Sequence, residues 1–266
     1  MKIDRDEKCI ILMPTHSNYI DVVRNFLELK EKNWENCPYE IVISIFGENK
    51  TIDGYNCIYN GKDSSLIECI RNARNQYDSE YYMCFLGDAF INKKVNQSII
   101  DNILKAIIEN KFRYCSLFYT KNYKKMKSFN NNLRFIHSKD RYSHNFVAYI
   151  ASANYVDEDI CSCQTDVDYE LKYLGNKDDF YYNDHVIVKS NILNIVAGIR
   201  KGKWKVIPLQ KLKKDNPEVN FAYREKENLK ETAYGIFSKI SPYLPDNIRL
   251  FIKKMKCIEK KQVSKW

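Results

Sequence analysis

Short apolar runs alternate with amphipathic segments through the first half of the chain. Four runs have the length of strands, at residues 9–14, 39–46, 81–86 and 113–119. Between them, apolar residues at helical spacing predict helices over 19–32, from Ser65 to about Tyr77, and from Ser98 onward. Strands that alternate with helices indicate βαβ crossovers, so we expect an α/β fold with a mainly parallel, Rossmann-like sheet flanked by helices.

The second half of the chain is less regular. A polar stretch rich in Lys and Asn predicts a long loop over 120–145, and such loops in compact domains are either disordered or functional. The pattern then predicts a strand over 146–152, a helix over 186–197 and a strand over 204–209. The C-terminal part is predicted to be helical. We therefore expect one domain over 1–210 and a helical extension over 211–266.

Composition favours a folded protein in a reducing compartment. The 266 residues are 44% hydrophobic, which is enough for one large α/β domain with a real core. No run approaches the ~20 apolar residues of a membrane span. The N-terminus lacks the pattern of a secretory signal, so a cytoplasmic location is expected.

Nine cysteines include no CxxC pair. We expect buried thiols rather than a zinc site at the four that lie in apolar segments, which are Cys9, Cys69, Cys84 and Cys115.

The net charge of +9 has a large contribution from the C-terminus. Residues 247–266 hold seven Lys or Arg and one acid, Glu259. At helical spacing, apolar side chains there would share one face, namely Ile248, Phe251, Ile252, Met255 and Ile258. A basic amphipathic helix is typical of an element that binds a membrane surface, and packing on the core is the alternative interpretation. No signature of a nucleic-acid-binding fold is present, so we expect no nucleic-acid partner.

The strand predicted over 81–86 is followed by Gly87 and Asp88. Ligands bind at the carboxyl edge of open α/β sheets. A carboxylate there can hold Mn²⁺ or Mg²⁺ together with phosphate oxygens and water. Gly-Asp after a strand is also ordinary turn chemistry. A ligand-binding residue and a turn residue are therefore both open interpretations of Asp88.

The order of motifs resembles the GT-A glycosyltransferases, in particular family two and its bacterial surface-polysaccharide relatives. In the place of the family's first strand, Pro-Thr and helix stands "ILMPTHSNYIDVVRNFL". Later elements of the family pattern follow in order, at Ala73-Arg74-Asn75, Asp88, Asn183-Asp184-His185, Gly198 and Pro208. The resemblance covers roughly residues 8–210. It implies transfer of a sugar from a nucleotide-sugar donor, preferably a UDP-sugar, to a saccharide or lipid-linked acceptor at the inner face of the membrane.

The same resemblance implies roles for individual residues. Asp88 would bind the donor diphosphate or its metal ion. Asp184 would be the catalytic base, with His185 as the alternative. Contacts to the nucleotide-sugar would come from Pro14, Thr15, His16, Glu48, Arg71 and Arg74, and the acceptor region would include Tyr149 and Asn154. Simpler interpretations are a helix N-cap for Asp184, a solvated helix face for the two arginines, and loop polarity for Thr15 and His16.

Departures from the family pattern keep rival functions open. The family's strand-end motif is usually Asp-x-Asp, whereas this chain has one carboxylate, at Asp88. Glu48 and Asn183 stand where the family has Asp and Glu. A degenerate, non-catalytic nucleotide-sugar-binding protein is therefore one alternative. A nucleotidyltransferase is another, although "MPTHSNY" contains none of the glycines that are typical of the loop after the first strand in such enzymes.

Overall fold

The computed structural model describes residues 9–120, 126–140, 142–174 and 178–240. The chain divides into two compact units, Met1–Arg224 and Glu225–Trp266. The boundary expected at residue 210 instead falls inside helix α6 (Val206–Asp215). The first unit extends to Arg224 because helix α1 (Ile20–Asn33) holds the segment that follows α6.

Two side chains of α1 hold that segment. The Asn25 Nδ2 donates to the Asn220 carbonyl at 3.0 Å, and the Asn25 Oδ1 accepts the Ala222 N–H at 2.7 Å. One helical turn earlier, Asp21 accepts a hydrogen bond from Arg224 Nε at 2.7 Å. These contacts make residues 220–224 part of the first unit.

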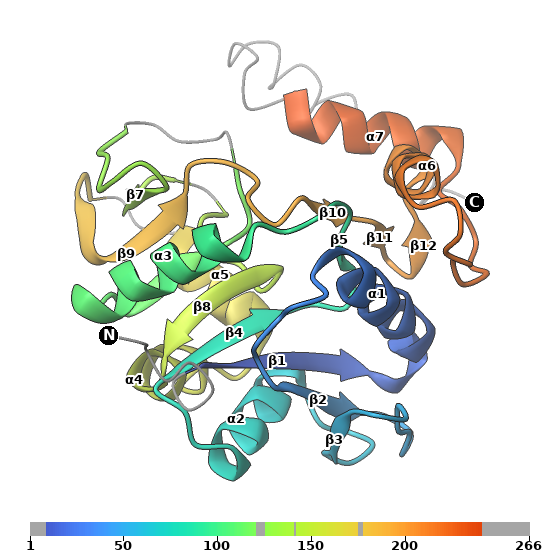
Figure 1. Ribbon diagram of the computed structural model, residues 1–266, viewed down its shortest axis with the longest axis horizontal. Helices are drawn as coiled ribbons and strands as arrows, with labels where there is room; N and C mark the ends of the chain where they lie inside the picture. Colours follow the sequence, from blue (N-terminus) through green and yellow to red (C-terminus); the bar gives the residue numbers. More distant parts are fainter. Residues whose placement is uncertain (1–8, 121–125, 141, 175–177, 241–266) are drawn as a thin grey trace, which may run out of the picture. The chain divides into compact units, whose positions relative to one another are not determined.

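The described residues of the first unit form an eight-stranded sheet with the strand order β3-β2-β1-β4-β8-β6-β9-β7 (Figure 1). Its strands are β1 (Cys9–His16), β2 (Ile41–Phe46), β3 (Asn56–Tyr59), β4 (Tyr81–Phe85), β6 (Tyr114–Ser116), β7 (Leu133–His137), β8 (Ala148–Ser152) and β9 (Tyr181–Val188). The four strands from β3 to β4 are mutually parallel, and β6 is parallel to β9. The expected α/β fold with a mainly parallel sheet is confirmed.

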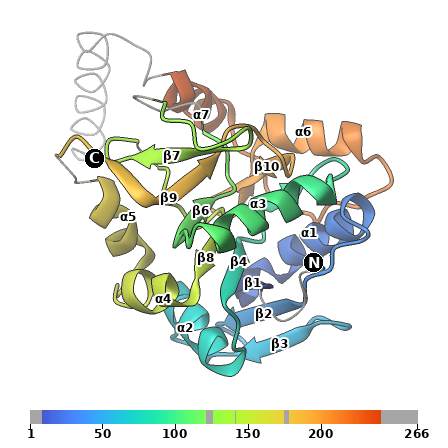
Figure 2. The same ribbon diagram turned by 60° about the vertical axis from the view of Figure 1, so that its left-hand side comes forward.

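Helices cover both faces of the sheet (Figures 1 and 2). On one face lie α1 and α3 (Gln97–Glu109), and on the other lie α2 (Leu66–Gln76) and the segment after β8. That segment contains α4 (Ala153–Tyr155), η2 (Val156–Ile160) and α5 (Asp166–Leu174). Because both faces are covered, β1 and β4 are apolar at nearly every position, as in other buried parallel strands.

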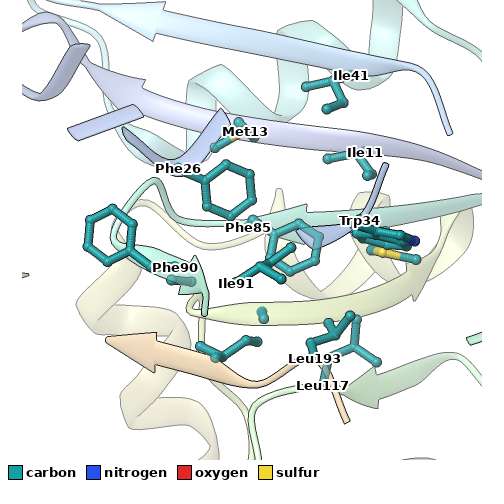
Figure 3. Close-up of a cluster of buried hydrophobic side chains, with 14 of the residues drawn as sticks. Ile11, Met13, Phe26, Trp34, Ile41, Phe85, Phe90, Ile91, Leu117 and Leu193 are labelled. Carbon is teal, nitrogen blue, oxygen red and sulfur yellow. The ribbon is translucent and has the colours of Figure 1, made fainter. Parts of the chain in front are cut away.

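Alternate side chains of strand β1 contribute to the hydrophobic cores on the two faces of the sheet. Ile11 and Met13 point to the face of α1, and Ile10 and Leu12 point to the face of α2. On the α1 side, Phe26 packs against Phe85 of β4 with ring centroids 5.6 Å apart (Figure 3). The four cysteines expected in apolar segments are all buried as free thiols.

Two small sheets lie beyond the carboxyl end of β4. Strand β5 (Ala89–Ile91) pairs with β10 (Ile195–Ala197), and β11 (Ile199–Arg200) pairs with β12 (Lys203–Trp204), both antiparallel. A 3-10 turn, η1 (Ser17–Tyr19), joins β1 to α1. These elements gather at one edge of the main sheet.

Two sequence predictions in this part of the chain were wrong. The helix expected over 186–197 is replaced by β9, a turn and β10, because pairing with β6, β7 and β5 outweighs the helical spacing of the apolar residues. The strand expected over 204–209 ends at Trp204, and α6 begins at Val206. Pro208 lies in the first turn of α6, where its missing N–H breaks no helical hydrogen bond.

The second unit contains α7 (Leu229–Ile240), which confirms the helix expected there. Its start is fixed by a reciprocal cap, since Asn228 Oδ1 accepts the Glu231 N–H at 2.9 Å and Glu231 Oε2 accepts the Asn228 N–H at 2.8 Å. The basic amphipathic helix expected within residues 247–266 lies outside the described residues. Within the described part of the chain, no helix is both long and apolar enough to cross a membrane.

Candidate functional site

The carboxyl ends of the parallel strands β1 to β4 meet at one edge of the sheet. From β1 the chain continues to β2 and β3 on one side, and it then crosses to β4 on the other. The strand order therefore reverses between β1 and β4. Such a switch point is where open α/β sheets bind ligands, because the connections leave in opposite directions and a crevice forms between them.

Asp88 lies at this switch point. The chain turns after β4, with the Leu86 carbonyl accepting the Ala89 N–H at 2.9 Å. The register pairs Leu12 with Cys84, and β4 ends at Phe85, so Asp88 follows the strand at its carboxyl end. Asp88 is thus a turn residue at the carboxyl edge of the sheet.

Gly87 explains how the turn fits beneath α1. A Cβ at this position would come within 2.7 Å of Val23 Cγ2. Glycine therefore lets the turn approach the helix and sets Asp88 at the edge of the sheet. A larger residue would push the turn away from α1.

The Asp88 carboxyl group is half-buried and has a positively charged neighbour. Burial raises its pKa above the ordinary value, and three interactions oppose this rise: the Lys205 ammonium, the Asp88 N–H and the Ile199 N–H. The Asp88 carbonyl accepts the Gly198 N–H at 3.1 Å. The turn after β4 is therefore bound to the strands around residue 199 through both its backbone and its side chain.

The end of β1 brings three predicted residues to the same edge. Pro14, Thr15 and His16 close the strand, and the first two are buried. The His16 Nδ1 accepts the Asn18 N–H at 3.0 Å, which caps the turn η1. The His16 ring lies edge-on to Phe46 at the end of β2, with centroids 4.8 Å apart.

Glu48 follows β2 at this edge, as predicted. Its N–H donates to Ser17 Oγ at 2.8 Å, which ties the end of β2 to the turn after β1. Its exposed carboxylate lies 2.9 Å from Lys50 Nζ, and this lysine lowers the pKa of Glu48. The structure thus brings together five of the predicted residues: Pro14, Thr15, His16, Glu48 and Asp88.

Asp184 and His185 lie at the opposite edge of the sheet. His185 pairs with Tyr114 of β6. Through β8 and β4 this row of paired residues continues to Ile10, near the start of β1, so His185 lies level with Ile10 across the sheet. The six residues from Ile10 to His16 span about 20 Å along a strand. This corrects the expectation that Asp184 or His185 is the base beside Asp88, because side chains at opposite edges cannot act on the same bond. Asp184 is also not a helix N-cap, since it lies within β9.

His185 belongs instead to a buried cluster of rings. Its Nδ1 lies 3.0 Å from His144 Nε2, and His144 stacks on Tyr173 with centroids 3.7 Å apart. Burial lowers the pKa of both histidines, that of His185 to about 4. A neutral, hydrogen-bonded pair with little exposure is a structural element. Tyr149, expected near the acceptor, is also buried in the core beside this cluster.

Arg71 and Arg74 are also far from Asp88. The Arg74 guanidinium lies 5.6 Å from the ring centroid of Tyr82 and 3.1 Å from Asp78. Tyr82 pairs with Ile10, near the start of β1. The Arg71 Nη2 donates to the Cys161 carbonyl at 2.7 Å. Both side chains hold α2 to the amino edge of the sheet. This corrects their expected contact with a pyrophosphate at the carboxyl edge.

Lys205, the charged neighbour of Asp88, belongs to a basic segment that was not predicted from the sequence. Residues 199–205, the basic hairpin, comprise β11, β12 and Lys205. The stretch "IRKGKWK" carries four positive charges and no acid: Arg200, Lys201, Lys203 and Lys205. Alternating apolar and basic residues around Lys-Gly could have predicted a two-residue hairpin. The position of the hairpin beside Asp88 depends on tertiary pairing.

The side chains at this edge determine whether it can bind a divalent cation. Within the described residues, no group of three His, Cys, Asp or Glu side chains could hold a metal ion. Asp88 has an ammonium as its charged neighbour, where a metal-binding pair would have a second carboxylate. The side chains at this edge therefore fit an anion better than a protein-held Mn²⁺ or Mg²⁺.

No protein-family model matches the chain, and no curated protein matches it. Among solved structures, the chain is similar to 2-C-methyl-D-erythritol 4-phosphate cytidylyltransferase from Thermus thermophilus. The identity is 8%, the TM-score is 0.46, and the match covers 79% of this chain and 98% of that one.

Two further structures are similar. A cytidylyltransferase from Leptospira borgpetersenii has 14% identity and a TM-score of 0.40, covering 63% of this chain and 71% of that one. TarS from S. aureus has 13% identity and a TM-score of 0.44, covering 68% of this chain and 57% of that one. At such identities these similarities concern the fold and carry no information on the reaction.

Proposed function

We propose that the chain is a GT-A-like glycosyltransferase that moves a sugar from a nucleotide-sugar donor, preferably a UDP-sugar, to a saccharide or lipid-linked acceptor. The position of Asp88 is the observation that supports this best. Asp88 follows a buried parallel strand at the switch point of the sheet, and the Lys205 ammonium is its charged neighbour. A carboxylate and a cation at this point suit a donor that carries both sugar hydroxyls and phosphates.

The proposed reaction breaks one bond and forms one. The acceptor oxygen attacks the anomeric carbon of the donor sugar, and the bond from that carbon to the diphosphate oxygen breaks. The bonding electron pair leaves with the nucleoside diphosphate, and the acceptor proton is released. The protein must bind the leaving diphosphate and hold the two reactants in line. Any Mn²⁺ or Mg²⁺ would be held mainly by donor phosphates and water, with Asp88 as its protein ligand.

The connection after β1 favours glycosyl transfer over nucleotidyl transfer. Residues 14–19 contain no glycine, and two hydrogen bonds hold the turn in place. Asn18 N–H donates to His16 Nδ1, and Ser17 Oγ accepts the Glu48 N–H. A glycine-free turn of this kind differs from the glycine-rich loop that is typical of nucleotidyltransferases.

The cellular setting is part of the proposal. We place the reaction in bacterial surface-polysaccharide synthesis, at the inner face of the cell membrane. The element proposed to bind the membrane surface is the basic segment near residues 247–261, which lies outside the described residues. Its test is co-sedimentation of the full chain with vesicles that contain anionic lipid.

Donor cleavage tests the proposed activity. The full chain would be incubated with UDP-, GDP-, CMP- and dTDP-sugars and with saccharide or lipid-linked acceptors. The proposal predicts acceptor-dependent release of the nucleotide from one donor class. Release of pyrophosphate from a nucleoside triphosphate and a sugar phosphate would instead identify a nucleotidyltransferase. Donor binding that stabilises the protein against unfolding, with no release under any condition, would identify the non-catalytic alternative.

A further inference from the structure

We propose that Arg224 is a positioning residue for the proposed donor site, because it holds the turn after β1 and the basic hairpin in one fixed arrangement at the carboxyl edge of the sheet. Arg224 acts through these two elements and not through contact with the donor. The inference rests on the proposed function for the identity of the ligand. The clamp that Arg224 forms can be measured without any ligand.

The Arg224 guanidinium contacts the connection that follows β1. Its Nε donates to Asp21 Oδ2 at 2.7 Å, and its Nη2 donates to Asp21 Oδ1 and to the Asn18 carbonyl. The guanidinium also lies over the Tyr19 ring, 4.8 Å from the centroid. A bidentate pair with a carboxylate fixes the plane of a guanidinium as well as its position. Arg224 therefore has a defined orientation against η1 and the start of α1.

The third nitrogen of the same guanidinium reaches the basic hairpin. Arg224 Nη1 donates to the Gly202 carbonyl at 3.3 Å. Lys201 and Gly202 have positive φ angles of 50° and 79°, which are typical of a two-residue hairpin turn. The accepting carbonyl is thus at the tip of the hairpin. One planar group therefore fixes the distance between the tip of the hairpin and the turn after β1.

Both elements lie at the edge where the donor is proposed to bind. The turn η1 follows β1, and its Ser17 Oγ accepts the Glu48 N–H from the end of β2. The hairpin leads into Lys205, whose ammonium acts on the Asp88 carboxyl group. Arg224 therefore connects the side of the switch point formed by β1 and β2 with the side formed by β4.

The clamp is better shielded from water than an ordinary surface ion pair. The Arg224 side chain is 15% exposed, and its partner Asp21 is 40% exposed. Hydrogen bonds from a charged donor are stronger than those between neutral groups. The base of the hairpin has a separate support, since Trp204 stacks on Phe90 with centroids 5.3 Å apart. Loss of Arg224 should therefore release the tip of the hairpin and leave the fold intact.

A released hairpin has a specific kinetic consequence. When the arrangement that binds a ligand is only partly populated, the apparent dissociation constant rises by the inverse of that population. The bound complex restores the arrangement, so KM rises and kcat changes little. Global destabilisation would instead reduce the amount of active protein, which lowers the apparent kcat and leaves KM unchanged. The two roles of Arg224 can therefore be separated by experiment.

Amide hydrogen exchange of the full chain without ligand, followed by mass spectrometry, tests the clamp. Each element has an amide whose hydrogen bond reports its order: Ile20 N–H donates to the Ser17 carbonyl, and Lys205 N–H donates to the Gly198 carbonyl at 2.8 Å. In Arg224→Gln, we expect exchange in the peptides that contain these amides to rise about tenfold or more, as for loss of a charged hydrogen bond.

Lys32→Gln is the matched control. Lys32 lies in the last turn of α1 and forms an ion pair with Glu218, so it also ties α1 to the segment that contains Arg224. It lies about 16 Å along the helix from Asp21 and away from the carboxyl edge. Exchange in the two peptides should stay at the wild-type rate in Lys32→Gln.

Calorimetry with UDP and kinetics with UDP-sugar donors test the positioning role. We expect Arg224→Gln to bind UDP about tenfold more weakly, and Lys32→Gln to stay within about twofold of wild type. With a UDP-sugar, KM should rise by a similar factor in Arg224→Gln while kcat stays within a few-fold. Arg224→Lys keeps a cation beside Asp21 but lacks the planar fork, so exchange in the hairpin should stay raised.

Three results would overturn the inference. They are wild-type exchange in Arg224→Gln or Arg224→Lys, an equal rise in Lys32→Gln, and raised exchange with wild-type affinity for UDP. A fall in kcat at unchanged KM would reduce Arg224 to a structural residue. The proposed function can fail separately. Exchange and UDP affinity that depend on Arg224, without any sugar transfer by the wild type, would leave the inference standing and overturn only the proposed activity.

Discussion

The Lys205 ammonium is the charged group that acts on the half-buried Asp88 carboxyl group, although the two residues belong to distant parts of the sequence. Lys205 lies just before α6, and Asp88 lies in the turn after β4. The pairing of β5 with β10 brings these segments together. The carboxyl edge of the sheet therefore brings an acid and an ammonium group from distant parts of the sequence together.

Replacing Asp88 by Asn should not destabilise the protein at neutral pH. Because burial raises the pKa of Asp88 in the folded state, the charged form lowers stability as pH rises through that pKa. Asn removes this cost. We expect a Tm at pH 7.5 equal to or above that of the wild type, with the difference shrinking as pH falls and the wild-type carboxyl group becomes protonated. Thermal unfolding of both proteins at several pH values from 7.5 downward measures this difference in Tm. A markedly lower Tm for Asp88→Asn would mean that its charged hydrogen bonds dominate.

Replacing Gly198 by Ala should displace the basic hairpin. A Cβ at this position would lie 2.6 Å from the Phe90 ring and 2.9 Å from the Trp204 ring. Overpacking of this kind costs about 1–3 kcal/mol of stability. Urea unfolding of the variant and the wild type would measure this loss.

The double variant Gly198→Ala/Phe90→Leu is the control for that clash. The smaller Leu side chain leaves room for the new Cβ, so part of the lost stability should return. A double-mutant cycle should give a favourable coupling energy of about 0.5–3 kcal/mol. Additive effects would show that the Gly198 substitution acts by some route other than contact with Phe90.

The buried pair of His144 and His185 should make the protein sensitive to mild acid. Burial lowers the pKa of both rings, and the charged groups around His185 are Asp184, Asp159, Arg113 and Lys172. Because the unfolded chain binds protons that the folded chain excludes, stability is complete above the ordinary histidine pKa. It falls as pH drops from about 6.5 toward 4, by at most about 1.4 kcal/mol per pH unit for each proton.

Urea unfolding at several pH values between 4 and 7.5 measures this dependence. The double variant His144→Gln/His185→Gln keeps polar side chains but cannot titrate in this range. Its unfolding free energy should fall less steeply with decreasing pH than that of the wild type. Equal slopes in the two proteins would show that other groups cause the acid sensitivity.

Local signals made much of the first half of the fold predictable. The capping box of Ser65 and Glu68 marks the start of α2, and the structure contains both of its hydrogen bonds. The buried run over 81–86 marks β4. By contrast, the apolar run over 186–197 fits a helix and a strand equally well by itself. Only the pairing of β9 and β10 with distant strands decides between them.

The candidate site could be predicted only in part, for a related reason. Residues that directly follow parallel strands meet at one edge, so the positions of His16, Glu48 and Asp88 follow from the order of strands and helices. Asp184 lies inside a strand. Which residues of the neighbouring strands it lies beside depends on the pairing register, which the sequence does not encode locally. The contribution of Lys205 depends on the pairing of β5 with β10.

The most direct test of the central claim compares Asp88→Asn with Asp184→Asn in donor-dependent release of the nucleotide. Both substitutions neutralise one carboxylate at a residue that the resemblance connects with catalysis, but the two residues lie at opposite edges of the sheet. We expect release to fall at least about 100-fold in Asp88→Asn, as when a group needed in the transition state is lost. In Asp184→Asn, release should stay within a few-fold of wild type. Loss of release in Asp184→Asn with full activity in Asp88→Asn would contradict it and move the active site to the other edge.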